Sequence, residues 1–169
     1  MPGRDEPLHA PDAGPLGLAP GPSIRALSHL ECEAVLARHS VARVAHAFDR
    51  QVSILPIHYV YDEGWMYGRT SFSTKVTLWQ HSHWVAVEVD EVRALFDWES
   101  VVVRGALYVL SPDDTEADAA VWERAVDLLR RLVPGTGTAF DPVPRRTVLF
   151  RIHVDEVTGR ECRPGPPPA

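Results

Sequence analysis

The fold is decided by residues 56–92, which read PIHYVYDEGWMYGRTSFSTKVTLWQHSHWVAVEVDEV. β-Branched and aromatic side chains predict strands over 52–61 and 83–92, with another strand beginning at Trp65. Two acidic residues followed by glycine form the turn before Trp65, and Ser73 is placed to cap a short helix before the last strand. Strand, turn and strand in this order predict antiparallel pairing.

The residues upstream extend this pattern. A further strand is predicted over 41–48, and the polar residues 49–51 join it to the strand at 52–61 as a hairpin. Before that strand, Ser28 and Glu31 stand three residues apart in a capping-box pattern, which predicts the start of a helix.

The residues downstream supply a long strand over 98–110, with Gly105 as a bulge or kink, and a final strand over 145–157. Between them, Asp113 or Asp114 opens a long amphipathic helix. Strands joined by short turns, with few helices, predict a mainly β fold with flanking helices. The pattern favours an antiparallel sheet closed into a barrel over a parallel sheet.

The chain has 169 residues, which fits one domain. Residues 1–23 are rich in proline and glycine and 163–169 are rich in proline, so both ends are expected to be extended or disordered. The folded domain is expected over 24–162.

Composition excludes several classes of protein. A net charge of -6 argues against general nucleic-acid binding, which needs a broad excess of basic residues. No apolar run approaches the ~18 residues of a membrane span, and no leader pattern is present, so we expect a cytoplasmic protein. Cys32 and Cys162 are expected to be free thiols. No metal site is expected, because His81 and His83 lack an evident third ligand.

The bend after the third strand suits a phosphate group. A helix start exposes unpaired N–H groups and carries partial positive charge, and Ser73, Thr74 and Lys75 fall there. Arg69 and the hydroxyl of Thr70 stand just before it. The spacing matches neither a P-loop nor a dinucleotide fingerprint. The alternative, that these are solvated charges and turn residues, stays open on composition.

In order, residues 56–92 followed by WESVVVRGALYVLSPDD (98–114) resemble the flavin-binding split-barrel superfamily of pyridoxamine 5'-phosphate oxidase, nearest its nitroimidazole-resistance branch. The resemblance lies in the order of P-x-x-Y, an acidic-glycine turn, S-x-K and W-x-S-V-x-V-x-G. It runs from the first helix to the closing TVLFRIHVDEVTGRE.

This resemblance implies a six-stranded antiparallel split β-barrel that forms a homodimer, with FMN in clefts between the protomers. It places cofactor-binding residues in three groups. The phosphate group comprises Arg69, Thr70, Ser73, Thr74 and Lys75; the ring group comprises Leu55, Pro56, Ile57 and His58; the group approaching from the partner protomer comprises Trp98, Glu99 and Ser100.

The resemblance also implies an activity. We expect an FMN-dependent oxidoreductase, similar to a flavin reductase or nitroreductase, that transfers hydride from a nicotinamide donor to a small organic acceptor. No catalytic residue is assigned, since the cofactor carries this redox chemistry. A vitamin B6 oxidase is disfavoured because no tryptophan follows Trp122, and Gly68 and Arg69 stand where the nitroimidazole branch often has histidine. The alternatives are a flavin- or haem-binding carrier or sensor, a deazaflavin-dependent reductase, or FAD in place of FMN.

Overall fold

A computed structural model describes residues 21–73, 76–77, 79, 82–113 and 115–165. Six antiparallel strands close into a ring, because β6 pairs with β5 on one side and with β7 on the other. The ring strands are β2 (Val41–Phe48), β3 (Gln51–Asp62), β4 (Trp65–Thr70), β5 (Trp84–Ala94), β6 (Asp97–Val109) and β7 (Val148–His153). The predicted mainly β, six-stranded antiparallel split barrel is thereby confirmed.

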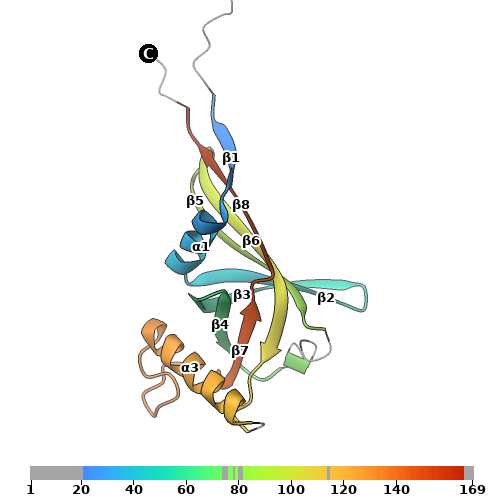
Figure 1. Cartoon of the computed structure of the whole chain (residues 1–169), viewed down its shortest axis with the longest axis vertical. Coiled ribbons are helices and arrows are strands. Elements are labelled where there is room, and N and C mark those ends of the chain that lie inside the picture. Colours follow the sequence, from blue (N-terminus) through green and yellow to red (C-terminus); the bar gives the residue numbers. More distant parts are fainter. Residues whose placement is uncertain (1–20, 74–75, 78, 80–81, 114, 166–169) are drawn as a thin grey trace, which may run out of the picture.

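Two more strands extend the sheet beyond the ring. They are β1 (Ser23–Leu27), which pairs with β8 (Glu156–Arg163), and β8 itself, which also pairs with β6. Both lie at the end of the molecule opposite helix α3 (Figure 1). The prediction of one final strand over 145–157 was wrong, because the chain turns at Val154 and Asp155, whose N–H groups donate to the carbonyls of Gly64 and Arg104.

Strand β6 changes partners along its length. Residues 98–104 pair with β8 and residues 107–109 pair with β7, so β6 changes its partner strand at Gly105. A Cβ at Gly105 would lie 1.7 Å from the carbonyl oxygen of His153, so no other residue fits there without moving backbone. The register with β5 passes through Gly105 unbroken, and the irregularity in that pairing lies between Val92 and Ala94.

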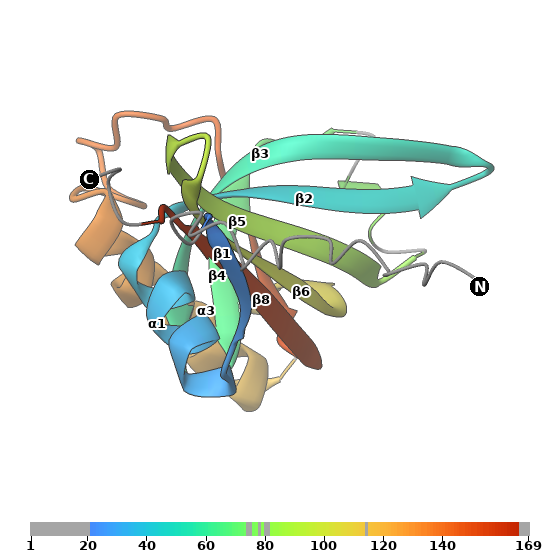
Figure 2. The same ribbon diagram turned by 90° about the horizontal axis from the view of Figure 1, so that it is seen from above.

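A tight turn joins the strands in each of the two N-terminal hairpins, β2–β3 and β3–β4. Asp49 and Arg50 both have positive φ between β2 and β3, and Glu63 and Gly64 have positive φ between β3 and β4. Two consecutive residues of this kind match the twist of a two-residue hairpin. The β2–β3 hairpin extends away from the barrel body (Figure 2).

Helix α1 (His29–Arg38) begins as predicted. The Ser28 side chain accepts from the Glu31 N–H, and the Glu31 carboxylate accepts from the Ser28 N–H. The helix buries Cys32, Val35 and Leu36 in the core of the barrel.

Helix α3 (Glu116–Leu132) starts at a different cap from the one predicted. Thr115 is the N-cap and accepts from the Asp118 N–H, whereas the Asp113 N–H donates to the Ser111 hydroxyl in the preceding turn. Asp114 lies outside the described residues. The helix packs on the outside of β4 and β7, which sets one wall of the candidate site (Figure 1). The contact is formed by Tyr67, Ala125, Leu128, Leu129 and Leu149.

Among the described residues, no helix is both long enough and apolar enough to cross a membrane.

Candidate functional site

Arg69 stands at the end of β4, and the structure gives it a carboxylate partner. Its guanidinium donates to both oxygens of Asp141, at 2.5 and 3.0 Å, and both side chains are only 6% exposed. Asp141 also accepts from the N–H groups of Gly137 and Val143. These four donors, with the hydrogen bond from Arg69 as the main cause, hold the pKa of Asp141 well below its usual range. The pair therefore fixes the loop after α3 onto the barrel.

The other residues predicted to bind the phosphate, at the end of β4 and the start of the following helix, form a polar corner that is described only in part. Thr70 is buried at the end of β4, whereas Ser73 is exposed, and its carbonyl accepts from the Val76 N–H at 2.9 Å. Residues 76, 77 and 79 are helical, which agrees with a short helix beginning after Ser73. Thr74 and Lys75 lie outside the described residues.

Two further arginines, which the sequence did not single out, reach the same corner. Arg145 and Arg146 line a cavity of about 310 Å³ together with Ser71. Within the described part of the chain, neither side chain has a carboxylate partner, whereas Arg69 does. The signal in the sequence was a doubled arginine just before a strand, but only the fold brings it beside β4.

The residues predicted to contact the flavin ring, 55–58 and 98–100, lie on two different faces of the sheet. Cα partners in an antiparallel ladder carry their side chains on the same face. Pro56 and His58 therefore lie on the exterior face, together with Trp98 and Ser100 of β6. The other predicted residues of these segments face inward: Leu55 and Ile57 pack in the core, and Glu99 is buried against Arg38.

The exterior face is apolar and exposed toward the end that carries Val52 and Ile54, whereas Arg43, Glu88 and Asp90 form ion pairs on the same face beside Pro56. Val52 is 71% exposed, Ile54 is 64% exposed and Trp84 is 68% exposed. Together with three alanines of β2 and β5, Val52 and Trp84 border a shallow depression of about 330 Å³. Exposed apolar surface that is contiguous across several strands is typical of an interaction site rather than of a free surface.

His46 and Trp79 bring two unpaired polar atoms into the interior. His46 is 7% exposed and its ring meets the Trp79 indole edge-on, with centroids 6.3 Å apart. Neither Nδ1 of His46 nor Nε1 of Trp79 has a hydrogen-bond partner in the described structure. Burial lowers the pKa of His46, so the imidazole is held neutral.

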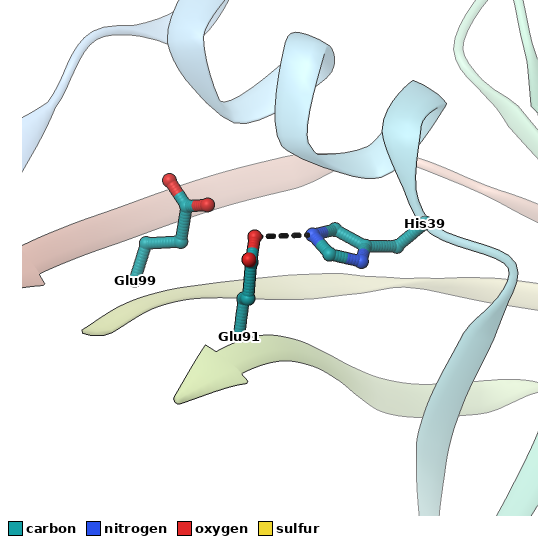
Figure 3. Close-up of side chains that lie close together, drawn as sticks. All are labelled: His39, Glu91 and Glu99. Carbon is teal, nitrogen blue, oxygen red and sulfur yellow. Dashed lines mark ion pairs between the residues drawn. The ribbon is translucent and has the colours of Figure 1, made fainter. Parts of the chain in front are cut away.

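A second polar cluster joins the end of α1 to the β5–β6 hairpin. His39, Glu91 and Glu99 place one potential ligand atom each within 4.8 Å of one another (Figure 3). The carboxylates already have arginine partners, since Arg93 contacts Glu91 at 2.8 Å and Arg38 pairs with Glu99. The Arg93 hydrogen bond is the main reason that the pKa of Glu91 is lowered. The arrangement is an ion-pair network.

The other histidines considered as metal ligands do not join this cluster. His83 stacks on Tyr108 and its Nδ1 lies 3.2 Å from the Leu107 carbonyl oxygen, and His81 lies outside the described residues.

A closed six-stranded antiparallel barrel with an exposed apolar exterior face and a polar corner at the end of β4 defines the split-barrel class. The family model for pyridoxamine 5'-phosphate oxidase matches residues 28–161, so the chain belongs to this family. The predicted family is thereby confirmed.

Known relatives cover most of the chain. A FAD-binding protein from Mesorhizobium loti is 30% identical, with 82% of this chain and 97% of that chain covered and a TM-score of 0.67. A FAD-binding protein from Mycobacterium smegmatis is 26% identical, covering 80% and 98% of the two chains with a TM-score of 0.58. An uncharacterised protein from Rhizobium meliloti is 28% identical over 152 residues, which are 84% of this chain and 97% of that one.

Proposed function

We propose that the chain binds a flavin between two copies of itself and acts as a flavin-dependent oxidoreductase. The observation that carries the proposal is the proximity of the exterior face to the polar corner: His58, on that face, and Arg69, at that corner, are close enough to border the same cavity. A flavin needs both, because its ring system is flat and apolar while its tail is anionic. Two relatives named as FAD-binding, at 30% and 26% identity, support the cofactor class.

The residues present fit such a cofactor. The ring would lie against the exterior face at Pro56 and His58, which are exposed and stand beside the ion pairs that Arg43 makes with Glu88 and Asp90. The phosphate would lie at the end of β4, where the hydroxyls of Thr70 and Ser73 can donate hydrogen bonds. Arg145, which has no carboxylate partner among the described residues, would add a positive charge beside Ser71.

Arg69 takes a role different from a simple phosphate clamp. Both terminal nitrogens of its guanidinium already donate to Asp141, so its first contribution is to hold the loop that carries Arg145. The guanidinium has five N–H groups, so donors remain beyond the two that bind Asp141, but the side chain is only 6% exposed.

When bound, the flavin supplies the chemistry of hydride acceptance from a nicotinamide donor and delivery to an organic acceptor. The chain's own residues bind and orient it, and they exclude water from one side of the ring. FMN would bring one phosphate to this corner and FAD two, and Arg145, beside Ser71, would offer a positive charge to either cofactor.

A second copy of the chain is the partner that we propose for the exterior face. Replacing Ile54 with glutamate puts a charge among the exposed apolar side chains of this face and is expected to shift the protein to monomer in analytical ultracentrifugation. Phe140→Glu is the matched control, because Phe140 is 89% exposed but lies in the loop after α3. A dimer that survives Ile54→Glu would contradict the proposed interface.

The cofactor is tested by purifying the protein, recording its visible spectrum and titrating it with FMN and FAD. Lys75→Ala is expected to weaken flavin affinity about tenfold or more, since one charged hydrogen bond contributes about 1.5–3 kcal/mol. A protein that stays colourless with either flavin would contradict the proposal. Flavin binding without acceptor-dependent oxidation of NADPH would instead favour a carrier or sensor.

A further inference from the structure

A cavity of about 360 Å³ lies where the C-terminal end of α3 meets the barrel. Its walls come from four parts of the chain: the end of the helix, the loop after it, the residue before β2, and neighbouring positions of β3 and β4. The lining residues are Ser40, His58, Arg69, Leu129, Leu132, Val133, Pro142, Val143 and Arg146. The volume falls in the lower part of the range typical of small-molecule sites, about 300–1,000 Å³.

The lining has a defined chemical character. Most of the wall is apolar, and the polar groups are one hydroxyl, one imidazole and two guanidinium groups. Among the described residues no carboxylate lines this cavity, although the chain as a whole carries a net charge of -6. Asp141 offsets the charge of Arg69 from the neighbouring cavity, which Arg146 also borders, but Arg146 has no ion pair with a described residue and so is the uncompensated cation.

Arg146 is presented by a fixed segment of chain. Its N–H donates to the Val143 carbonyl, and the Val143 N–H in turn donates to Asp141, which is held by Arg69. Its guanidinium, in contrast, has no hydrogen bond or ion pair within the part of the chain that the structure describes. A cation at the edge of an apolar cavity suits an anionic ligand, and the hydrogen-bonded loop lowers the cost of binding because only the Arg146 side chain, and not its backbone, remains to be ordered.

We infer that this cavity binds a compact organic anion with an apolar body. The carboxylate or equivalent anionic group pairs with Arg146, and the body packs against Leu129, Leu132 and Val133. That this anion is the acceptor of the reaction rests on the proposed flavin function, since His58 lies both on the cavity wall and on the face assigned to the ring. The binding itself does not depend on flavin.

The test uses three probes of matched shape: 4-methylbenzoate, its neutral amide 4-methylbenzamide, and the cation 4-methylbenzylammonium. Each is titrated calorimetrically into the full-length protein, with and without added flavin. The benzoate is expected to bind about tenfold or more tighter than the amide, as a charge-assisted hydrogen bond predicts. The benzylammonium is expected to bind weakest.

The variant Arg146→Gln is expected to abolish this preference, so that benzoate and amide bind alike. Arg131→Gln is the matched control, because Arg131 is also exposed and lies next to Leu132 on α3 but does not line the cavity. Both substitutions are at exposed side chains, and equal thermal midpoints confirm that both variants fold.

Three results would overturn the inference: wild-type protein that does not distinguish benzoate from amide, no benzoate binding in the millimolar range, or equal effects of Arg146→Gln and Arg131→Gln. The flavin titration separates this inference from the proposed function. Protein that binds benzoate through Arg146 but takes up no flavin would uphold the anion site and reject the flavoprotein, and the reverse result would do the opposite.

Discussion

Replacing Asp141 with asparagine would leave the Arg69 guanidinium buried without a counter-charge. Arg69 is only 6% exposed at the side chain, and among the described residues both hydrogen bonds that its terminal nitrogens donate go to this carboxylate. Breaking a buried pair by removing one partner costs about 3–5 kcal/mol. An asparagine oxygen still accepts one hydrogen bond, so the lower end, about 3 kcal/mol, is expected. In a chain of this length that corresponds to a fall in melting temperature of about 6–12 °C.

The same pair predicts a pH dependence. Hydrogen bonding to Arg69 holds the folded-state pKa of Asp141 below its value in the unfolded chain, which is about 3.9. A lowered pKa stabilises the fold at pH values above the unfolded-state pKa, and this stabilisation is lost as the pH falls toward the folded-state value. Wild-type stability should therefore decrease below about pH 4 more steeply than that of Asp141→Asn.

The assay is urea unfolding followed by tryptophan fluorescence, with Arg69→Met, Asp141→Asn and the double variant completing a mutant cycle. The two single changes are expected to be strongly non-additive, because each removes the same interaction. Arg124→Met is the control: its pair with Asp62 is exposed at the arginine, so a far smaller effect is expected. The reasoning is refuted if Asp141→Asn is no more destabilising than this control, or if the two single effects simply add.

Three further predictions concern stability. Gly105→Ala should cost about 3 kcal/mol or more in urea unfolding, since its Cβ would meet the His153 carbonyl oxygen at 1.7 Å; a near-neutral variant would show that β6 can shift. Burial lowers the pKa of His46, so the free energy of unfolding should fall by up to about 1.4 kcal/mol per pH unit below the unfolded-state pKa of about 6.5. His46→Phe should flatten this dependence of stability on pH, and an unchanged dependence would exclude His46 as its source. Ser28→Ala should cost about 1 kcal/mol by loss of the N-cap of α1, and thermal unfolding equal to that of the wild type would contradict the cap's contribution.

Much of the candidate site was predictable in outline. The strand that carries Pro56 and His58, and the bend that carries Thr70 and Ser73, follow from local patterns of apolar, turn and capping residues. Whether these residues bind a cofactor, and whether the nitroimidazole branch is the nearest one, stay predictions. The sequence could not show that Arg69 has a partner, because Asp141 is 72 residues away and nothing local joins the two.

The cap of α3 illustrates a narrower limit. Asp113, Asp114 and Thr115 are all residue types that cap helices, so the sequence offered three starting points within three residues. The structure selects Thr115, and the residues of α3 that pack on Tyr67 and Leu149 are Ala125, Leu128 and Leu129, well after the helix start.

The sequence by itself determined the antiparallel hairpins and the capping box of α1, because turn conformation, capping and the alternation of side chains act between residues close along the chain. Only the tertiary structure decided the pairing of β1 with β8, the change of partners at Gly105 and the meeting of Arg69 with Asp141. Pairings of this kind join segments far apart in sequence, and the closure of the barrel selects them by bringing strand edges and loop ends within hydrogen-bonding distance.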